Sequence, residues 1–240
     1  SENEISGEIP SSLWSLPFLH VLNLSKNQLS SSISPFLWDL PFLEYLYLNS
    51  NNLTGTLPNI PSTMPALKHV WLYENSLSGR LTSSLSNLVN LEILVVYDND
   101  FNETLDLQWS LPNLYYIDLS WNHFSGRLPD DLNAATSLQF FYLNNNTLTG
   151  TLNEELGDLT HLKELWLQSN GLIGEIPTTF GQLKNLSTLL LYDNSLHGSV
   201  PESLCNLTRS GNLTVFETDC HKENRNGTAS VSCTCCTACH

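Results

Sequence analysis

The sequence has few basic residues. Nine Lys and Arg stand against 24 Asp and Glu among 240 residues, which gives a formal net charge of −15. A partner held through its phosphates would be repelled over about 8 Å, the screening length at physiological salt. The composition therefore argues against a nucleic acid or an anionic membrane surface as the partner.

The sequence also lacks long apolar runs. A membrane-spanning helix needs about 18 or more consecutive apolar residues, and no such run occurs. The first residues, Ser1 to Pro10, lack the basic and apolar segments of a signal peptide. We expect no membrane span in this chain, and we expect that a signal was removed or that the chain begins as a fragment.

Cysteine is absent from residues 1–204. All six cysteines follow, at Cys205, Cys220, Cys233, Cys235, Cys236 and Cys239. An even number in a segment too short for its own core indicates disulfides and an oxidising compartment. We predict a Cys205–Cys220 bridge, with the other four cysteines paired among themselves. The alternative is a zinc or copper cluster that uses the Cys-rich run with His221 or His240, but we predict no metal site.

Asn-x-Ser/Thr sequons are dense, and they predict N-glycosylation in the secretory route. They begin at Asn23, Asn52, Asn102, Asn145, Asn185, Asn206, Asn212 and Asn226. Chance gives some sequons in a chain rich in Asn, Ser and Thr. Together with the cysteines, however, they favour an extracellular protein, secreted or at the cell surface.

A repeat of 24 residues, once 23, runs through the chain. It is marked by Asn3, Asn27, Asn51, Asn75, Asn99, Asn122, Asn146, Asn170 and Asn194. An apolar frame precedes each complete example, as in Leu43-x-x-Leu46-x-Leu48-x-x-Asn51. The alternation of period two predicts a short parallel strand with its leucines inside and their neighbours outside. We expect the Asn amides to bond backbone groups where the chain turns off the strand.

A glycine follows the Asn in most coils, where a residue without Cβ eases a tight bend. It stands at Gly7, Gly55, Gly79, Gly126, Gly150, Gly174 and Gly198, while Ser31 and Glu103 replace it in two coils.

The pattern L-x-x-L-x-L-x-x-N-x-L-S-G-x-I-P resembles the plant-type leucine-rich repeat of receptor ectodomains and polygalacturonase inhibitors. The resemblance covers Ser1 to about Leu204, and the tail from Cys233 to Cys239 is similar to endings of diatom and algal leucine-rich-repeat proteins. It implies an α/β-type solenoid: a right-handed superhelix with a concave parallel sheet of about eight strands and a disulfide-rich C-terminal cap. Extended or short helical segments would form the convex side, and the concave side would bind proteins, peptides or glycans.

We divide the chain into a solenoid, residues 1–204, and a Cys-rich cap and tail, residues 205–240. The solenoid starts in mid-repeat without an N-terminal cap. Trimmed residues, a preceding domain or another subunit could cover it. The last possibility supports the hypothesis of a glycosylated structural subunit that assembles end to end into a fibre or coat.

The outward strand positions are rich in aromatic rings. They include Tyr45, Tyr47, Trp71, Tyr73, Tyr97, Tyr116, Phe140, Tyr142, Trp166 and Tyr192. A large exposed aromatic surface usually marks an interface, although cross-strand packing is the alternative explanation. Carboxylates surround the rings at Glu44, Glu74, Glu92, Asp98, Asp118, Glu164 and Asp193. This charge fits a basic or polyhydroxylated partner.

We predict no enzymatic activity and no cofactor. The seven histidines lie on different coils, and no nucleophile with a paired acid or Gly-rich phosphate loop interrupts the repeat. Our leading hypothesis is an extracellular, glycosylated recognition module that binds a protein, peptide or glycan through its aromatic concave face. An ice- or polysaccharide-surface binder is a third hypothesis, and the mixed chemistry of the outward positions argues against it.

Overall fold

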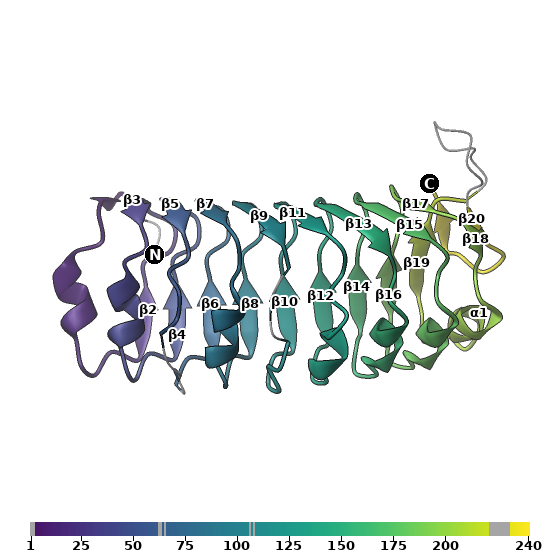
Figure 1. The fold of residues 1–240 in the computed structure, drawn as a ribbon, viewed down its shortest axis with the longest axis horizontal. Helices are drawn as coiled ribbons and strands as arrows, with labels where there is room; N and C mark the ends of the chain where they lie inside the picture. The colour runs from purple at the N-terminus through teal and green to yellow at the C-terminus, as the bar shows by residue number, and fades with distance from the viewer. Residues whose placement is uncertain (1–2, 62–63, 65, 106, 108, 221–230) are drawn as a thin grey trace.

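The computed structural model describes residues 3–61, 64, 66–105, 107, 109–220 and 231–240. The chain forms one solenoid of stacked coils, from the purple N-terminal end to the yellow C-terminal end in Figure 1. Two long parallel sheets run along the solenoid, one of ten strands and one of nine. Most coils add a short 3₁₀ helix on a third side.

The ten-stranded sheet contains the strands that the leucine frames predicted. Its members are β2 (Val21–Asn23), β4 (Tyr45–Tyr47), β6 (His69–Trp71), β8 (Ile93–Val95), β10 (Tyr116–Asp118), β12 (Phe140–Tyr142), β14 (Glu164–Trp166), β16 (Thr188–Leu190), β19 (Val215–Thr218) and β21 (Ala238–Cys239). The eight predicted strands are confirmed, and the C-terminal segment adds β19 and β21. Equivalent residues of successive coils pair, so that Tyr47, Trp71 and Val95 lie side by side.

The nine-stranded sheet is more regular than the extended segments that the resemblance implied. It consists of β1 (Ser6–Gly7), β3 (Gln28–Ser32), β5 (Asn52–Thr56), β7 (Ser76–Gly79), β9 (Asp100–Thr104), β11 (His123–Gly126), β13 (Thr147–Thr151), β15 (Gly171–Gly174) and β17 (Ser195–Leu196). From β3 onward, each of these strands directly follows a repeat Asn and buries an apolar residue near its start, such as Leu53 in β5.

The third side carries the 3₁₀ helices. They are η1 (Ser11–Ser15), η2 (Pro35–Asp39), η3 (Ser83–Asn87), η4 (Leu132–Ala134), η5 (Glu154–Asp158) and η6 (Thr178–Gln182). The helix α1 (Glu202–Arg209) packs against η6 and continues this row. Among the described residues, no helix has both the length and the apolarity of a membrane span.

The repeat asparagines have the structural role that the sequence predicted. Asn99 is buried, and its Oδ1 accepts a hydrogen bond from the Leu77 N–H at 3.0 Å. Its Nδ2 donates to the carbonyls of Leu72 and Val96, both at 3.1 Å, and of Tyr97 at 3.2 Å. Asn51, Asn75, Asn122, Asn146, Asn170 and Asn194 repeat this pattern. Each amide thus satisfies buried backbone groups that would otherwise lack partners.

Ser31 occupies a backbone position that suits glycine. Gly55, the equivalent residue of the next coil, has φ +79°, whereas Ser31 has φ 98°. L-residues adopt such values only with strain. We expect Ser31→Gly to raise the free energy of unfolding by about 0.5 to 1 kcal/mol, since relief of strain outweighs the added chain entropy.

The matched control is Ser30→Gly on the same strand, because the backbone of Ser30 does not have a positive φ. Glycine there brings only the entropy cost and should lower stability by about 0.5 kcal/mol or more. Urea titrations of the two variants measure both effects, and shifts of the same sign would contradict the strain at Ser31.

The C-terminal disulfides differ from the prediction. The bridges are Cys205–Cys235, Cys220–Cys239 and Cys233–Cys236, so the predicted Cys205–Cys220 bridge is wrong. Cys205 lies on α1 in the helical row, whereas Cys220 follows β19 in the ten-stranded sheet. The tail returns as β21 beside β19, with Thr218 paired to Cys239, and this pairing brings Cys239 to Cys220. Every cysteine sulfur is in a disulfide, which leaves no thiolate for the alternative metal cluster; His221 lies outside the described residues.

Candidate binding face on the ten-stranded sheet

The outward side of strands β4 to β14, together with the turns that follow them, carries most of the predicted aromatic residues. We call this surface the aromatic face. Its register places the rings of successive coils in rows about 4.8 Å apart. The rings form two groups along the solenoid, and the outward strand positions of β8 between them hold the aliphatic Ile93 and Val95.

The first group continues from β4 to the turn after β8. The rings of Tyr47 and Trp71 meet edge to face with their centroids 4.9 Å apart, and Trp71 reaches Tyr73 at 6.1 Å. Tyr73 stacks on Tyr97 at 4.6 Å with an angle of 9° between the ring planes. Tyr45 extends the group and packs against His69 at 4.9 Å.

The second group lies on β10, β12 and β14. Tyr116 contacts Phe140 at a centroid distance of 5.6 Å and Tyr142 at 5.4 Å, and Tyr142 contacts Trp166 at 4.7 Å. Tyr192 does not join either group. It stacks on His240 of the C-terminal segment at 4.1 Å.

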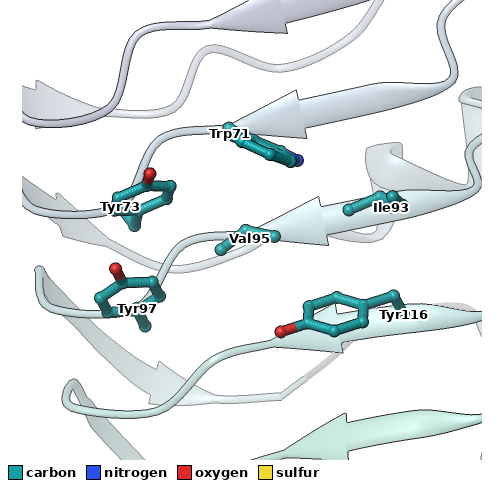
Figure 2. Close-up of a pocket in the computed structure, with 6 residues that line it drawn as sticks. All are labelled: Trp71, Tyr73, Ile93, Val95, Tyr97 and Tyr116. Atoms are coloured by element: carbon teal, nitrogen blue, oxygen red, sulfur yellow. The ribbon is translucent and has the colours of Figure 1, made fainter. Parts of the chain in front are cut away.

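Ring packing covers much of the aromatic surface. Most of these side chains are half-buried and Tyr142 is buried, so cross-strand packing is part of the arrangement. The rings nevertheless leave hollows between them. A central hollow of about 350 Å³ is lined by Trp71, Tyr73, Ile93, Val95, Tyr97 and Tyr116. Figure 2 shows these side chains projecting from three neighbouring coils, with Tyr73 beside Tyr97 at one side.

Two further hollows flank the central one. The N-terminal hollow, about 220 Å³, is lined by Asn23, Ser25, Lys26, Tyr47, Asn49, Trp71 and Tyr73. The C-terminal hollow, about 320 Å³, is lined by Tyr97, Tyr116, Asp118, Ser120, Trp121, Tyr142, Asn144 and Trp166. Adjacent hollows share rings, so the aromatic face offers a row of adjoining depressions, of which the N-terminal one is the most polar.

Trp121 belongs to this surface although the sequence prediction omitted it. Its side chain is 60% exposed and its backbone has φ 52°. The equivalent residues of the other coils are polar, and several are short, such as Asp98 and Asn145, whose side chains tolerate this left-handed conformation best among residues other than glycine. The sequence could therefore have identified Trp121, because it is a bulky residue at the position directly before a repeat Asn. A strained, exposed tryptophan beside a hollow suggests a binding role.

Three carboxylates near the aromatic face have side-chain partners of two kinds. Glu44 pairs with Lys68 at 2.7 Å and with His20 at 3.0 Å, and the Lys68 hydrogen bond lowers the pKa of Glu44. Glu74 and Glu164 instead accept hydrogen bonds from tyrosine hydroxyls.

Three tyrosine hydroxyls of the aromatic face, those of Tyr97, Tyr116 and Tyr142, stay protonated at neutral pH. Tyr97 donates to Glu74 at 3.3 Å and Tyr142 to Glu164 at 3.0 Å. Burial, the largest cause, raises the pKa of both phenols and raises the pKa of Tyr116 to about 12. These phenols are therefore neutral hydrogen-bond donors and add no negative charge to the face.

The described sequons lie on several sides of the solenoid. Asn23 is on β2 of the ten-stranded sheet, and its Oδ1 accepts hydrogen bonds from the Ser25 N–H at 3.1 Å and hydroxyl at 2.7 Å. Asn52 and Asn102 are exposed on the nine-stranded sheet. The others are exposed or half-buried at Asn145, Asn185, Asn206 and Asn212, while Asn226 lies outside the described residues.

Solved structures of plant receptors share this fold. The ectodomain of the Arabidopsis thaliana membrane receptor kinase GASSHO1/SCHENGEN3, in complex with CASPARIAN STRIP INTEGRITY FACTOR 2, is 39% identical over 89% of this chain and 25% of its own length, with a TM-score of 0.83. The plant peptide hormone receptor RGFR1 in complex with RGF2 is 30% identical over 92% of this chain and 35% of its own, with a TM-score of 0.84. A third structure is the Arabidopsis receptor kinase HAESA in complex with the peptide hormone IDA and the co-receptor SERK1. It is 30% identical over 89% of this chain and 40% of its own length, with a TM-score of 0.73. The chain thus spans less than half the length of each.

Family models agree with the structural likeness. A model described as leucine-rich repeats in two copies matches residues 17–62 and 136–180, and one described as a leucine-rich repeat matches residues 113–134 and 185–207. A search of curated proteins gives no match. The repeat, the two parallel sheets and these matches show that the chain belongs to the leucine-rich-repeat family, with repeats of the plant type.

Proposed function

We propose that this chain is an extracellular recognition module that binds a peptide segment along its aromatic face. The observation that carries the proposal is the row of three adjoining hollows between aromatic rings. The five strand steps from β4 to β14 cover about 24 Å, the length of roughly seven extended residues. An extended peptide could therefore occupy all three hollows with alternate side chains.

The packing of the rings favours binding. Tyr and Trp combine large contact area with a polar tip, and they are enriched among residues that dominate interface energies. Here, neighbouring rings already restrict one another, as the Tyr73–Tyr97 stack does. Less side-chain freedom is then lost when a ligand binds, which strengthens affinity at constant contact area.

The structural likeness supports a peptide rather than another ligand class. The similar GASSHO1/SCHENGEN3, RGFR1 and HAESA structures are described as complexes with CASPARIAN STRIP INTEGRITY FACTOR 2, RGF2 and the peptide hormone IDA. The three disulfides and the dense sequons support an extracellular location.

Selection of phage-displayed random dodecapeptides against the full chain tests this function. Selected peptides should bind Trp71→Ala and Trp166→Ala at least about tenfold more weakly, because both indoles line the hollows and hot-spot truncations cost about 2 kcal/mol or more. Fluorescence anisotropy of the labelled peptides measures the affinities.

The matched control is Ile173→Ala, which removes a half-exposed apolar side chain from β15 on the other sheet. Its affinity should equal that of the wild type. Peptides that bind all three variants equally, or a selection that enriches no peptide, would reject peptide binding at the aromatic face.

Two sequence predictions are independent of peptide binding. Glycosylation predicts that the intact mass of the native protein exceeds that of the chain and falls after treatment with a peptide N-glycosidase.

End-to-end assembly predicts a sedimentation coefficient that rises with protein concentration. A constant coefficient over a hundredfold range would contradict assembly.

A further inference from the structure

We infer that the C-terminal hollow around Asp118 receives a positively charged side chain of the peptide ligand, preferably that of arginine. This inference rests on the proposed function and adds a ligand chemistry to it. The hollow combines a carboxylate without a counter-ion, a ring of aromatic side chains and an unsatisfied amide oxygen.

Asp118 supplies the negative charge at the hollow. It lies on β10, and its Oδ1 accepts hydrogen bonds from the Ser120 N–H at 3.0 Å and the Ser120 hydroxyl at 2.6 Å. Among the described residues, its other oxygen has no hydrogen-bond partner, and no Lys, Arg or His forms an ion pair with it. Glu44, three coils away, shows the contrast, since Lys68 and His20 neutralise it.

The desolvated carboxylate is costly in the unbound protein. Burial raises the pKa of Asp118, and the two Ser120 hydrogen bonds oppose that rise. A partly buried charge without a counter-ion lowers stability. A ligand cation would restore the missing electrostatic partner, whereas an anionic group would be repelled.

The aromatic residues of the hollow suit a cation as well. Tyr97, Tyr116, Tyr142, Trp121 and Trp166 line it together with Asp118. A cation near the faces of such rings is attracted by their π electrons, most strongly when it is desolvated. Lys68 near Tyr45 and Lys163 near Phe140 already form contacts of this kind elsewhere on the sheet.

Asn144 gives a second, independent sign of an absent ligand donor. Its side chain is only 6% exposed, yet its Oδ1 has no hydrogen-bond partner among the described residues. The residue lines the same hollow as Asp118, from the turn after the adjacent strand β12. Buried acceptors without partners are rare because each costs free energy.

An arginine side chain would meet all three features at once. Its planar guanidinium carries five N–H donors in a fork, enough for both Asp118 and Asn144, and it stacks on aromatic faces. A lysine ammonium would satisfy the carboxylate, but with less ring contact. The hollow of about 320 Å³ has room for either group.

The experiment uses Nα-acetyl-arginine N-methylamide and its neutral isostere, the citrulline derivative, as probes of the full chain. Titrations followed by tryptophan fluorescence and by NMR should show at least about tenfold weaker binding of citrulline, a difference of 1.4 kcal/mol. Asp118→Asn should bind the arginine probe at least about tenfold more weakly. The asparagine keeps an oxygen for both Ser120 hydrogen bonds and removes the desolvated charge, so the variant should fold with a melting temperature no lower than that of the wild type.

The matched control is Asp98→Asn, which removes the same charge from an exposed turn one coil away. Its affinity for the arginine probe should stay within twofold of the wild type. Equal binding of arginine and citrulline by the wild type would overturn the inference, even if Asp118→Asn failed to fold. Equal loss in both Asp variants would overturn it too.

The selected dodecapeptides separate this inference from the proposed function. Peptides that lose affinity with Trp71→Ala and with replacement of a basic residue by citrulline support both. Peptides that need Trp71 but contain no required basic residue would overturn only the cation site. Arginine binding at Asp118 with no peptide selected would reject peptide binding while the cation site stands.

Discussion

Asn99→Asp should lower the free energy of unfolding by about 4 kcal/mol at neutral pH, the cost of burying an unpaired charge. The substitution is nearly isosteric, but it replaces the amide that donates to Leu72, Val96 and Tyr97 by an oxygen that faces three carbonyl oxygens. The Leu77 N–H keeps its acceptor. Urea denaturation followed by circular dichroism measures the loss.

The loss should depend on pH in a defined direction. Desolvation and the facing carbonyls raise the pKa of the new carboxyl in the folded state above its unfolded value. Protonation therefore restores one donor and favours folding, so the variant approaches wild-type stability as the pH falls, and the deficit is complete above the folded-state pKa.

Asn59→Asp makes the same chemical change on an exposed side chain. It should alter stability by less than about 0.5 kcal/mol. If Asn99→Asp were as mild as this control, the buried amide bonds would not hold the coils together.

Cys205→Ala with Cys235→Ala should lower stability by about 3 kcal/mol, since this bridge closes a long loop in the unfolded chain. The two cysteines are 30 residues apart, and Cys205 is buried where α1 meets the last coil. The bridge attaches the returning tail to the helical row. Thermal unfolding by calorimetry gives the difference.

Cys233→Ala with Cys236→Ala is the matched control, because those residues are only three positions apart. The smaller loop predicts a loss of about 2 kcal/mol or less. Equal losses in the two double variants would contradict the account, and a tryptic map with a Cys205–Cys220 peptide would contradict the connectivity itself.

The sequence was most informative where one residue type has one physical role. The leucine frames and repeat asparagines predicted eight strands and their register, because period-two burial and an amide at a turn leave few alternatives. The nine-stranded sheet was harder to predict. Segments such as Asn52–Thr56 are rich in small polar residues with a single buried leucine, a composition that also suits loops.

The sequence predicted which face of the sheet carries the aromatic residues, but not which of their side chains contact one another. Alternation alone placed Tyr47, Trp71 and Tyr142 outward on one sheet, as the structure has them. Ring angles, mutual burial and the lack of a counter-ion at Asp118 depend on side-chain packing between coils, which spacing does not encode. The disulfide pairing failed for a related reason, since it depends on the path by which β21 returns to β19.

The repeat amides also give the solenoid a direction. Asn99 bonds the Leu77 N–H and the Leu72 carbonyl, which both belong to the preceding coil, and every later repeat Asn does the same. The Asn amide of each coil is therefore hydrogen-bonded to the backbone of the preceding coil, and the next coil bonds it in the same way. Such a chain of nearest neighbours frays from its ends, so amide protons at β8 and β10 should exchange with deuterium more slowly than those at β2, and breaking the bonds of one Asn amide should loosen the coil on its N-terminal side first.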